Sequence, residues 1–459
     1  MRREIILVCL GALFSASGCK DFLNLQPIDS PTEGNFYVNE NALQGAVVSC
    51  YDAIQSDYLY GYNMCILAEN RGDNVADANI SGGSGVTYQI DAFSEQADNL
   101  AVTNAYLQMY CAIFRCNMAL DKAPLIKMDA AARNRLVGQA LFIRALCYFN
   151  IVRMWGKAPL ILKVQTNEEA RANTRSETKD IYAQIAADLN QAKDYLPTTW
   201  PESQRGRATS HAARGLLAKV YLYLKNYDMV ISVLKPLVNE IYEKKEKKAV
   251  GLVPQTSTFP NSIKTSIDVI FAVQYLLGGV GESAHQNNRY RNQDGSILIK
   301  LPQSLFESED NRKALMQQPP VLSRPGKFNS TQKNNETSGD MPLIRCAEIL
   351  LIYAEALNEA RRYPDTEAFK AINAVRTNAG ISALDITDNR TQADLRNAIW
   401  KERRLELALE CDRWFDIVRT EQFSKVFPLV PVFKLLYPVP QLEINNINDP
   451  TGWQNFGYY

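Results

Sequence analysis

The sequence predicts a mostly α-helical protein with a loop-rich, partly irregular lobe, and three observations lead to this expectation. Apolar residues recur at spacings of three and four from about 104 to 240 and again from 340 to 420, as in helices with one buried face. Within these regions, two stretches repeat a pattern of small and large apolar residues. Two other segments, 57–100 and 250–340, are rich in Gly, Asn, Ser and Pro, which favours long structured loops.

The N-terminus has the pattern of a secretory leader rather than of a folded element. Two arginines precede an apolar run, and the small residues "SASG" lead to Cys19. The pattern resembles the lipobox of bacterial lipoproteins, although Ala16 stands where Leu is usual. We therefore expect residues 1–18 to be a signal peptide and Cys19 to carry lipid, which would anchor the chain to a membrane. The alternative is a soluble secreted protein that is cut elsewhere.

Composition argues against several classes of function. The 459 residues include 50 basic and 50 acidic side chains, whereas nucleic-acid-binding proteins normally carry a basic excess or a basic stripe. Beyond Cys9 and Cys19, seven cysteines remain, an odd number without a CxxC pair, so no disulfide framework is expected. The two histidines of the chain are too few for a His-rich zinc site, and we expect no cofactor.

The helical regions contain a repeated two-helix unit. The stretches "LLAKVYLYLKNYDMVISVLKPL" (216–237) and "IYAEALNEARRYPDTEAFKAINAVR" (352–376) each place small and large apolar residues on two successive helices. A partial third copy has Leu189, Ala192 and Pro197. These offsets are typical of tetratricopeptide helix pairs, in which small residues let neighbouring helices approach closely. We expect a helical scaffold with few, degenerate repeats.

Seven stretches occur in a fixed order along the chain: "CKDFLNLQP", "ALFIRALCYFNIVRMWGKAPLI", "GRATSHAARGLLAKVYLYL", "DMPLIRCAEILLIYAEALNEA", "INAVRTNAGI", "ERRLELALECDRWFDIVRT" and "YPVPQLEINNINDPTGWQNFGYY". Together they resemble the SusD-like (RagB/SusD) lipoproteins. The resemblance implies one domain over residues 19–459, with about four tetratricopeptide-like helical pairs on one face, the loop-rich lobe on the other, and a C-terminal segment at 421–459.

The same resemblance implies a role and a location. SusD-like proteins are lipid-anchored on the exposed surface of the outer membrane. They bind an oligosaccharide or polysaccharide and deliver it to a SusC-like TonB-dependent transporter. We therefore expect a non-enzymatic glycan-binding lipoprotein with that transporter as its partner.

The charged stretch "ERRLELALECDRWFDIVRT" (402–420) is interpreted as structural. Glu402, Glu406 and Glu410 are spaced four apart, which favours ion pairs along a helix surface, each contributing only a few tenths of a kcal/mol. A catalytic pair of carboxylates would need a cleft and one raised pKa, and the stretch shows no sign of either.

Tyrosines in the two loop-rich segments are the predicted platform for a sugar, because the tryptophans lie outside these segments. Aromatic faces stack on the apolar C–H face of a pyranose, while polar neighbours bond its hydroxyl groups. The two arginines of "NNRYRNQ" suggest an acidic sugar or another carboxylate. The predicted ligand-binding residues are Tyr60, Tyr62, Asn63, Arg71, Asp73, Asn74, Tyr88, Tyr275, Asn288, Arg289, Tyr290 and Arg291.

Two other functions remain open at this point. A glycosidase or polysaccharide lyase would need paired acids, for which Asp73 with Asp77, or Glu307 with Asp310, are the candidates. A protein-binding scaffold is the other, since tetratricopeptide grooves commonly hold peptides. Binding without turnover would separate a glycan-binding protein from an enzyme.

Overall fold

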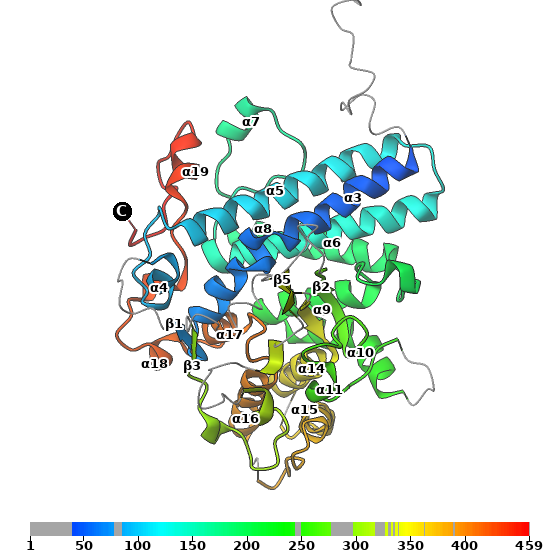
Figure 1. The fold of residues 1–459 in the computed structure, drawn as a ribbon, viewed down its shortest axis with the longest axis vertical. Coiled ribbons are helices and arrows are strands. Elements are labelled where there is room, and N and C mark those ends of the chain that lie inside the picture. Colours follow the sequence, from blue (N-terminus) through cyan, green and yellow to red (C-terminus); the bar gives the residue numbers. More distant parts are fainter. Residues whose placement is uncertain are drawn as a thin grey trace, which may run out of the picture.

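The structure is a computed structural model. It describes residues 39–458 apart from 78–84, 244–248, 277–296, 317–325, 329–331, 334–335, 338, 362 and 389–390. Within this part the protein is mostly helical, as predicted, and its strands form three two-stranded sheets (Figure 1). The predicted signal peptide, Cys19 and the predicted contacts at 288–291 lie outside the described residues.

The first half of the described chain forms a layer of long helices that pack side by side (Figure 1). They are α3 (Glu40–Gln55), α5 (Leu100–Lys122), α6 (Ala130–Trp155) and α8 (Thr178–Tyr195). Asn39, Asn99 and Asp129 cap three of these helices, and each side chain accepts a hydrogen bond from a backbone N–H of the first turn. Because those N–H groups have no partner within the helix, the caps fix where the helices begin.

Helix α6 is the core of this layer. It packs against α3, α5, α8 and α9 (Ser210–Tyr223). Among the described residues it is the one helix long and apolar enough to cross a membrane, yet 89% of its most apolar window is buried inside the protein. Its Phe142, Phe149 and Trp155 side chains are completely buried. These features are those of a core helix.

The second half of the scaffold continues the array. Its helices after α9 are α10 (Tyr227–Tyr242), α14 (Cys346–Ala360), α15 (Thr366–Asn378) and α16 (Gln392–Glu406). The two predicted repeats form the α9–α10 and α14–α15 pairs, and α10 packs against α14. The partial third copy lies in α8, where Leu189 and Ala192 are buried. The repeat prediction is therefore confirmed.

Shorter elements connect the long helices. The short α-helices are α4 (Val86–Asp91), α7 (Asn167–Arg171), α11 (Gln255–Thr258), α13 (Lys313–Met316), α17 (Arg413–Arg419), α18 (Phe423–Val426) and α19 (Gln441–Asn446). The antiparallel strand pairs are β1 (Val75–Asp77) with β3 (Ile297–Ile299), β2 (Val269–Val273) with β6 (Met341–Arg345), and β4 (Gln332–Lys333) with β5 (Glu336–Thr337). Since β1 and β3 come from different loop-rich segments, their pairing brings these two segments together.

The 402–420 stretch is two helices joined by a buried turn. Helix α16 ends at Glu406 and α17 begins at Arg413, and Leu409 and Cys411 in the turn between them have positive φ angles of 69° and 64°. The Glu69 carboxylate accepts the backbone N–H groups of both turn residues, at 3.0 and 3.2 Å. A side chain from the first loop-rich segment thus holds the turn.

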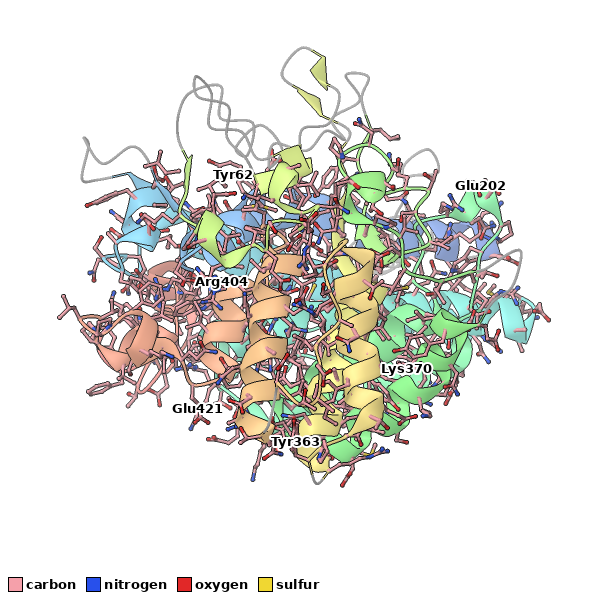
Figure 2. All side chains as sticks on the ribbon, turned by 90° about the horizontal axis from the view of Figure 1, so that it is seen from below. Tyr62, Glu202, Tyr363, Lys370, Arg404 and Glu421 are labelled. Carbon is pink, nitrogen blue, oxygen red and sulfur yellow. The ribbon has the colours of Figure 1, made fainter. Side chains whose placement is uncertain are left out.

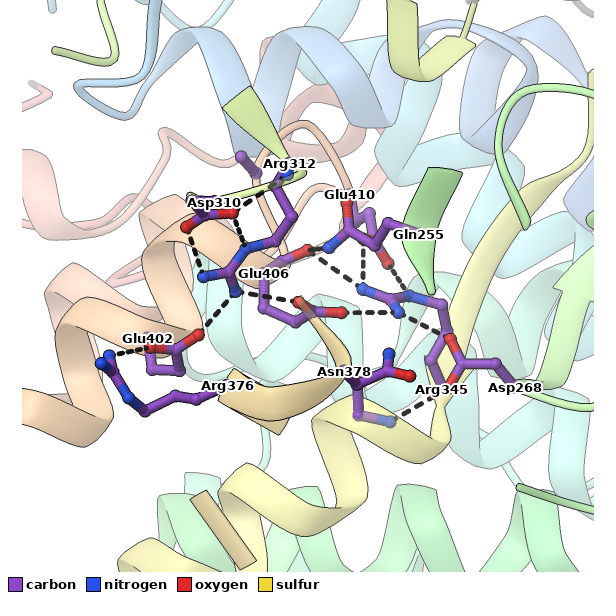
Figure 3. A network of polar contacts seen from close by, with 12 residues as sticks. Gln255, Asp268, Asp310, Arg312, Arg345, Arg376, Asn378, Glu402, Glu406 and Glu410 are labelled. Carbon is purple, nitrogen blue, oxygen red and sulfur yellow. Dashed lines mark hydrogen bonds and ion pairs between the residues drawn. The ribbon is translucent and has the colours of Figure 1, made fainter. Parts of the chain in front are cut away.

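The predicted surface position of the glutamates in this stretch is wrong. Glu402, Glu406 and Glu410 are 2%, 2% and 5% exposed. Figure 3 shows them in one network with arginines from other elements. Glu406 accepts hydrogen bonds from Arg312 and Arg345, each at 3.0 Å. The i, i+4 spacing therefore places the carboxylates towards Arg312 in the second loop-rich segment and towards Arg345 at the end of β6, which follows that segment.

Candidate ligand-binding groove

Five of the predicted contact residues are buried and bonded inside the protein. Tyr60 is 3% exposed, and its hydroxyl accepts a 2.7 Å hydrogen bond from Asn150 on α6. Tyr275 is 1% exposed, its hydroxyl donates to the backbone carbonyl of Gln55, and burial raises its pKa well above the usual value. Asn63 is also buried. None of these side chains presents a face to a ligand in this structure.

Arg71 and Asn74, the other two, hold the interior together. The Arg71 guanidinium pairs with Glu95 at 2.8 Å and donates to the backbone carbonyl of Lys434 at 2.6 Å. The Asn74 amide donates to Glu69, and its oxygen accepts from Arg404. Both residues therefore fasten the first loop-rich segment to later parts of the chain, and neither is free to meet a sugar.

Three of the four candidate catalytic acids are likewise bound to arginines, and the fourth, Asp77, is buried. Asp73 contacts Arg413 at 2.6 Å and Arg404 at 2.9 Å, and although burial raises its pKa, these guanidinium groups hold it below the usual value. Asp310 is buried against Arg312, and Glu307 contacts Arg376. Among the described residues, no group of three His, Cys, Asp or Glu side chains could hold a metal ion.

The predicted tyrosines that stay on the surface are Tyr62 and Tyr88, each half-buried. Tyr58, the first tyrosine of the same "DYLYGYN" run, is 53% exposed. In Figure 2, Tyr62 lies near one edge of the molecule, and Glu202 lies near that same edge. Tyr363 and Glu421 lie towards the opposite edge (Figure 2). The cavities considered next border the loop that carries Glu202.

Three cavities surround the loop between α8 and α9 and share its residues. Their volumes are about 310, 290 and 380 Å³. The first lies between the C-terminal half of α3 and the end of β2, the second beside β2, and the third beside the starts of α3 and α6. Arg207 lines all three, while Trp200 and Arg205 each line two. We call these three cavities, which share Arg207, the α8–α9 groove.

Hydrogen bonds to core helices fix the loop that forms the groove. The Trp200 indole N–H donates to the backbone carbonyl of Ala208 at 2.8 Å, which closes the loop on itself. The Ala208 N–H donates to the Tyr51 hydroxyl of α3 at 2.9 Å, and this hydroxyl donates to Gln139 of α6. Trp200 is half-buried, so part of the indole remains open to the cavities that it lines.

Gly206 sets the close contact between this loop and the strand beside it. Its φ angle is +100°, a conformation that side-chain-bearing residues rarely adopt. A Cβ atom at this position would stand 2.6 Å from the side-chain amide of Gln274. The glycine therefore lets the loop lie against Gln274, with Arg205 and Arg207 on either side of the contact.

The basic side chains of the groove are held in different ways. Arg205 donates to the backbone carbonyl of Lys264 at 3.2 Å and lies 3.4 Å from the exposed Glu202 carboxylate. The Lys264 ammonium donates to the backbone carbonyl of Tyr275 and lies 3.5 Å from Asp340.

Arg207 is held by a neutral side chain. It donates from Nη1 to Gln139 at 3.0 Å, and its guanidinium carbon is 5.9 Å from the centre of the Trp200 ring.

Sequence reasoning missed this groove, because it looked for the sugar platform in the two loop-rich segments and Trp200 lies outside them. One local signal was present: "TTWPESQRGR" combines a tryptophan, a proline, a glycine and two arginines in a connection between two helices. Polar and aromatic residues in a loop fixed by a rigid scaffold are a common basis for binding sites.

Two family models match the chain. The model described as the SusD family matches residues 303–429, and the model described as starch-binding associating with outer membrane matches residues 21–222. A relative from Formosa agariphila, SusD-like protein P2, is 26% identical, and the match covers 90% of each chain.

Solved structures share the fold. A laminarin-binding SusD-like protein superposes with a TM-score of 0.77 at 24% identity, covering 92% of this chain and all of the other. A SusD-like protein from Bacteroides fragilis gives a TM-score of 0.76 at 23% identity, covering 95% of this chain and all of the other. These likenesses establish the architecture, including the helical array that positions the groove.

Proposed function

The chain belongs to the SusD family, and from this premise we propose that it is a non-enzymatic oligosaccharide-binding protein of the outer-membrane surface. The observation that carries the proposal is the α8–α9 groove, where a half-buried tryptophan lies beside an arginine on a loop fixed to the core. An indole face can stack on the C–H face of a pyranose, and guanidinium and amide groups bond its oxygens.

Binding without turnover fits the chemistry of the described acids. Hydrolysis of a glycoside needs two carboxylates about 5–10 Å apart across a bound sugar, one of them with a raised pKa. Asp73 and Asp310 are instead ion-paired to arginines, and neither lines the α8–α9 groove. The groove offers stacking and hydrogen bonds. Its two lining carboxylates, Glu40 and Asp52, are twelve residues apart on α3, about 18 Å along the helix, which is too far for such a pair.

The second part of the proposal concerns handover of the sugar. We propose a lipid anchor at Cys19 and a SusC-like TonB-dependent transporter as the receiving partner. Support comes from the family membership, the description of one matching family as associating with the outer membrane, and the lipobox-like sequence before Cys19. A protein of this type would raise the local concentration of a dilute glycan at the mouth of the transporter.

Affinity gel electrophoresis of the purified protein tests binding and its location. Gels containing laminarin, starch, xylan, polygalacturonate or alginate would be compared with gels without polysaccharide. We expect slowed migration in at least one polysaccharide, and loss of the shift in Trp200→Ala. Trp400→Ala is the matched control, because that half-buried tryptophan lies on α16 and bonds Glu355.

Two results would overturn the proposal. One is wild-type migration that no polysaccharide of the panel slows. The other is release of reducing ends from the polysaccharide that binds, which would indicate an enzyme. An equal loss of binding in the Trp200 and Trp400 variants would instead remove the groove as the site and leave glycan binding in place.

A further inference from the structure

We infer that the α8–α9 groove selects acidic glycans, with Arg207 binding the carboxylate of a uronic acid residue whose ring lies against Trp200. This inference rests on the proposed function and specifies the substrate class for that site. The chain as a whole has equal numbers of basic and acidic residues, so a local excess of positive charge is not a consequence of composition.

The lining of the groove is basic. Four basic residues and two acidic ones line the three cavities: Arg135, Arg205, Arg207 and Lys264 against Glu40 and Asp52. Both acids are already engaged. Asp52 forms an ion pair with Arg115 at 2.5 Å, and Glu40 accepts a hydrogen bond from Gln44 at 3.1 Å. Arg115 neutralises Asp52, whereas Gln44 leaves the charge of Glu40 in place, so four basic residues of the lining stand against one uncompensated carboxylate.

Two further carboxylates border the groove, and both pair with other basic residues. Glu202 lies 3.4 Å from Arg205, in a pair exposed to solvent on both sides. Asp340 lies 3.5 Å from Lys264 and accepts the backbone N–H of Tyr275 at 2.9 Å. These contacts partly neutralise Arg205 and Lys264, which leaves Arg207 as the cation to consider.

Arg207 has no carboxylate partner among the described residues. Its Nη1 donates to the neutral amide oxygen of Gln139, and its Nε and Nη2 bond no atom in that part of the chain. The Nε–Nη2 edge is the one with which an arginine bonds both oxygens of a carboxylate. Elsewhere in the protein, half-buried and buried arginines such as Arg144 use this edge on an internal carboxylate.

The position of Arg207 suits a ligand rather than an internal acid. It lines all three cavities, so a sugar chain that occupied any of them would lie beside it. Trp200 lines two of these cavities, and its indole N–H is already used within the loop, so the part of its ring that is not packed against the core remains for stacking. A uronic acid offers both features that this pair recognises, an apolar ring face and a carboxylate.

The test compares acidic polysaccharides with their carboxyl-reduced forms. Polygalacturonate, alginate and glucuronoxylan would be used beside reduced counterparts, in which each carboxylate has become a primary alcohol. Laminarin, starch and unsubstituted xylan serve as neutral polysaccharides. We expect at least one acidic polysaccharide to bind the wild type about tenfold more tightly than its reduced form, and added salt to weaken only the acidic interaction.

Variants locate the effect. Arg207→Gln is expected to abolish the preference for the acidic form, so that the acidic and reduced forms bind with equal affinity, and Arg207→Lys to keep part of the preference. Arg361→Gln removes the same charge near Tyr363, at the opposite edge in Figure 2, and is expected to bind like the wild type. Thermal melts establish that each variant is folded. Arg205→Gln, at an exposed position, is a second variant of the groove.

The outcomes distinguish the inference about acidic glycans from the proposed function on which it rests. Binding of neutral polysaccharides with no preference for an acidic form overturns the inference about acidic glycans and leaves the proposed function standing. An acidic preference that survives in Arg207→Gln overturns the role of Arg207. Absence of binding to every acidic and neutral polysaccharide overturns both the inference and the proposed function.

Discussion

Arg345 and Glu410 form a bidentate ion pair in the interior: Nε donates to Oε2 at 2.8 Å and Nη2 donates to Oε1 at 2.7 Å. Arg345 ends β6, while Glu410 lies in the turn between α16 and α17, so the pair joins the strand that leads into α14 to the charged stretch. Arg345 also contacts Glu406 and Asp268 (Figure 3). Removing one member of such a network leaves another charge buried without its partner.

Glu406→Gln is therefore expected to destabilise the protein strongly. Breaking a buried ion pair by removing one partner typically costs about 3–5 kcal/mol, because the remaining charges stay desolvated. The measurement is urea unfolding at neutral pH. Glu421→Gln is the matched control: its pair with Lys225 is exposed on both sides, and such pairs contribute little to stability. Equal midpoints for the two variants would contradict the structural role of the network.

Trp414→Ala is expected to lower the free energy of unfolding by about 3–5 kcal/mol, as truncation of a buried aromatic residue usually does. Trp414 is completely buried and packs against Phe93 and Phe423, with ring centres 5.9 and 5.8 Å away. Trp414→Phe keeps most of this packing and should cost less. The measurement is denaturant unfolding of both variants, and an alanine variant as stable as the phenylalanine one would contradict the packing argument.

The scaffold was predictable because its signals are local. The small and large apolar residues of 216–237 and 352–376 lie within single helix pairs, and those pairs form as expected. The same reasoning failed for Glu406, since an i, i+4 pattern of glutamates has the same appearance on an exposed or a buried face. Its burial is decided by Arg312 and Arg345, which are 94 and 61 residues away along the chain.

The candidate site was less predictable because it depends on distant contacts. Tyr60 and Tyr275 lie in segments with the composition of surface loops, but Asn150 and Gln55 hold them in the interior. Trp200 lies in a short connection between two helices, and the local signal of that connection does not by itself show that a groove forms around it. The groove around it needs α3, α6 and β2 to come together, and that arrangement is a property of the whole fold.

Asp340 should make stability depend on pH near neutrality. Burial raises its pKa to about 7, despite the opposing effects of Lys264 and the Tyr275 N–H. In the unfolded chain its pKa is near 3.8, so between these values the folded state binds more protons than the unfolded state. The contribution of Asp340 to stability is therefore present in full below pH 4 and is lost as the pH rises through 7.

Asp340→Asn isolates this effect, since asparagine does not ionise. We expect the variant to gain stability relative to the wild type as the pH is raised from about 5 to about 8, measured by denaturant unfolding at each pH. Asp449→Asn is the control: that carboxyl is fully exposed and its pKa is lowered, so it titrates below this window. Parallel curves for the wild type and Asp340→Asn would contradict the assignment.

Cys19→Ala should release the protein from the membrane fraction. The sequence "SASGC" predicts that this cysteine carries the lipid, and lipid chains supply most of the membrane affinity of such proteins. The measurement is membrane fractionation in a strain without the partner transporter, so that protein contacts do not retain the variant. Cys9→Ala, in the leader, is the control and should stay membrane-bound. A Cys19 variant that still fractionated with membranes would contradict the lipidation prediction.

Gly206→Ala tests whether the shape of the α8–α9 loop controls binding. An alanine there meets two problems: the φ angle of +100° and a Cβ atom 2.6 Å from the Gln274 side chain. Gly452→Ala shares the first problem, with φ at +70°, but its Cβ would have no neighbour within 4 Å. Both variants should lose about 1–2 kcal/mol of stability from backbone strain.

Binding should separate the two glycine variants. In Gly206→Ala, the Cβ atom displaces the end of the Gln274 side chain, which lines two of the cavities, and the strain at φ +100° shifts the loop that carries Arg205 and Arg207, so affinity for the best polysaccharide of the panel should fall. Gly452→Ala should bind like the wild type, because Gly452 lines none of the cavities of the groove. Affinity electrophoresis and thermal melts on the same preparations measure the two quantities. Unchanged binding in Gly206→Ala would show that the ligand does not depend on this loop.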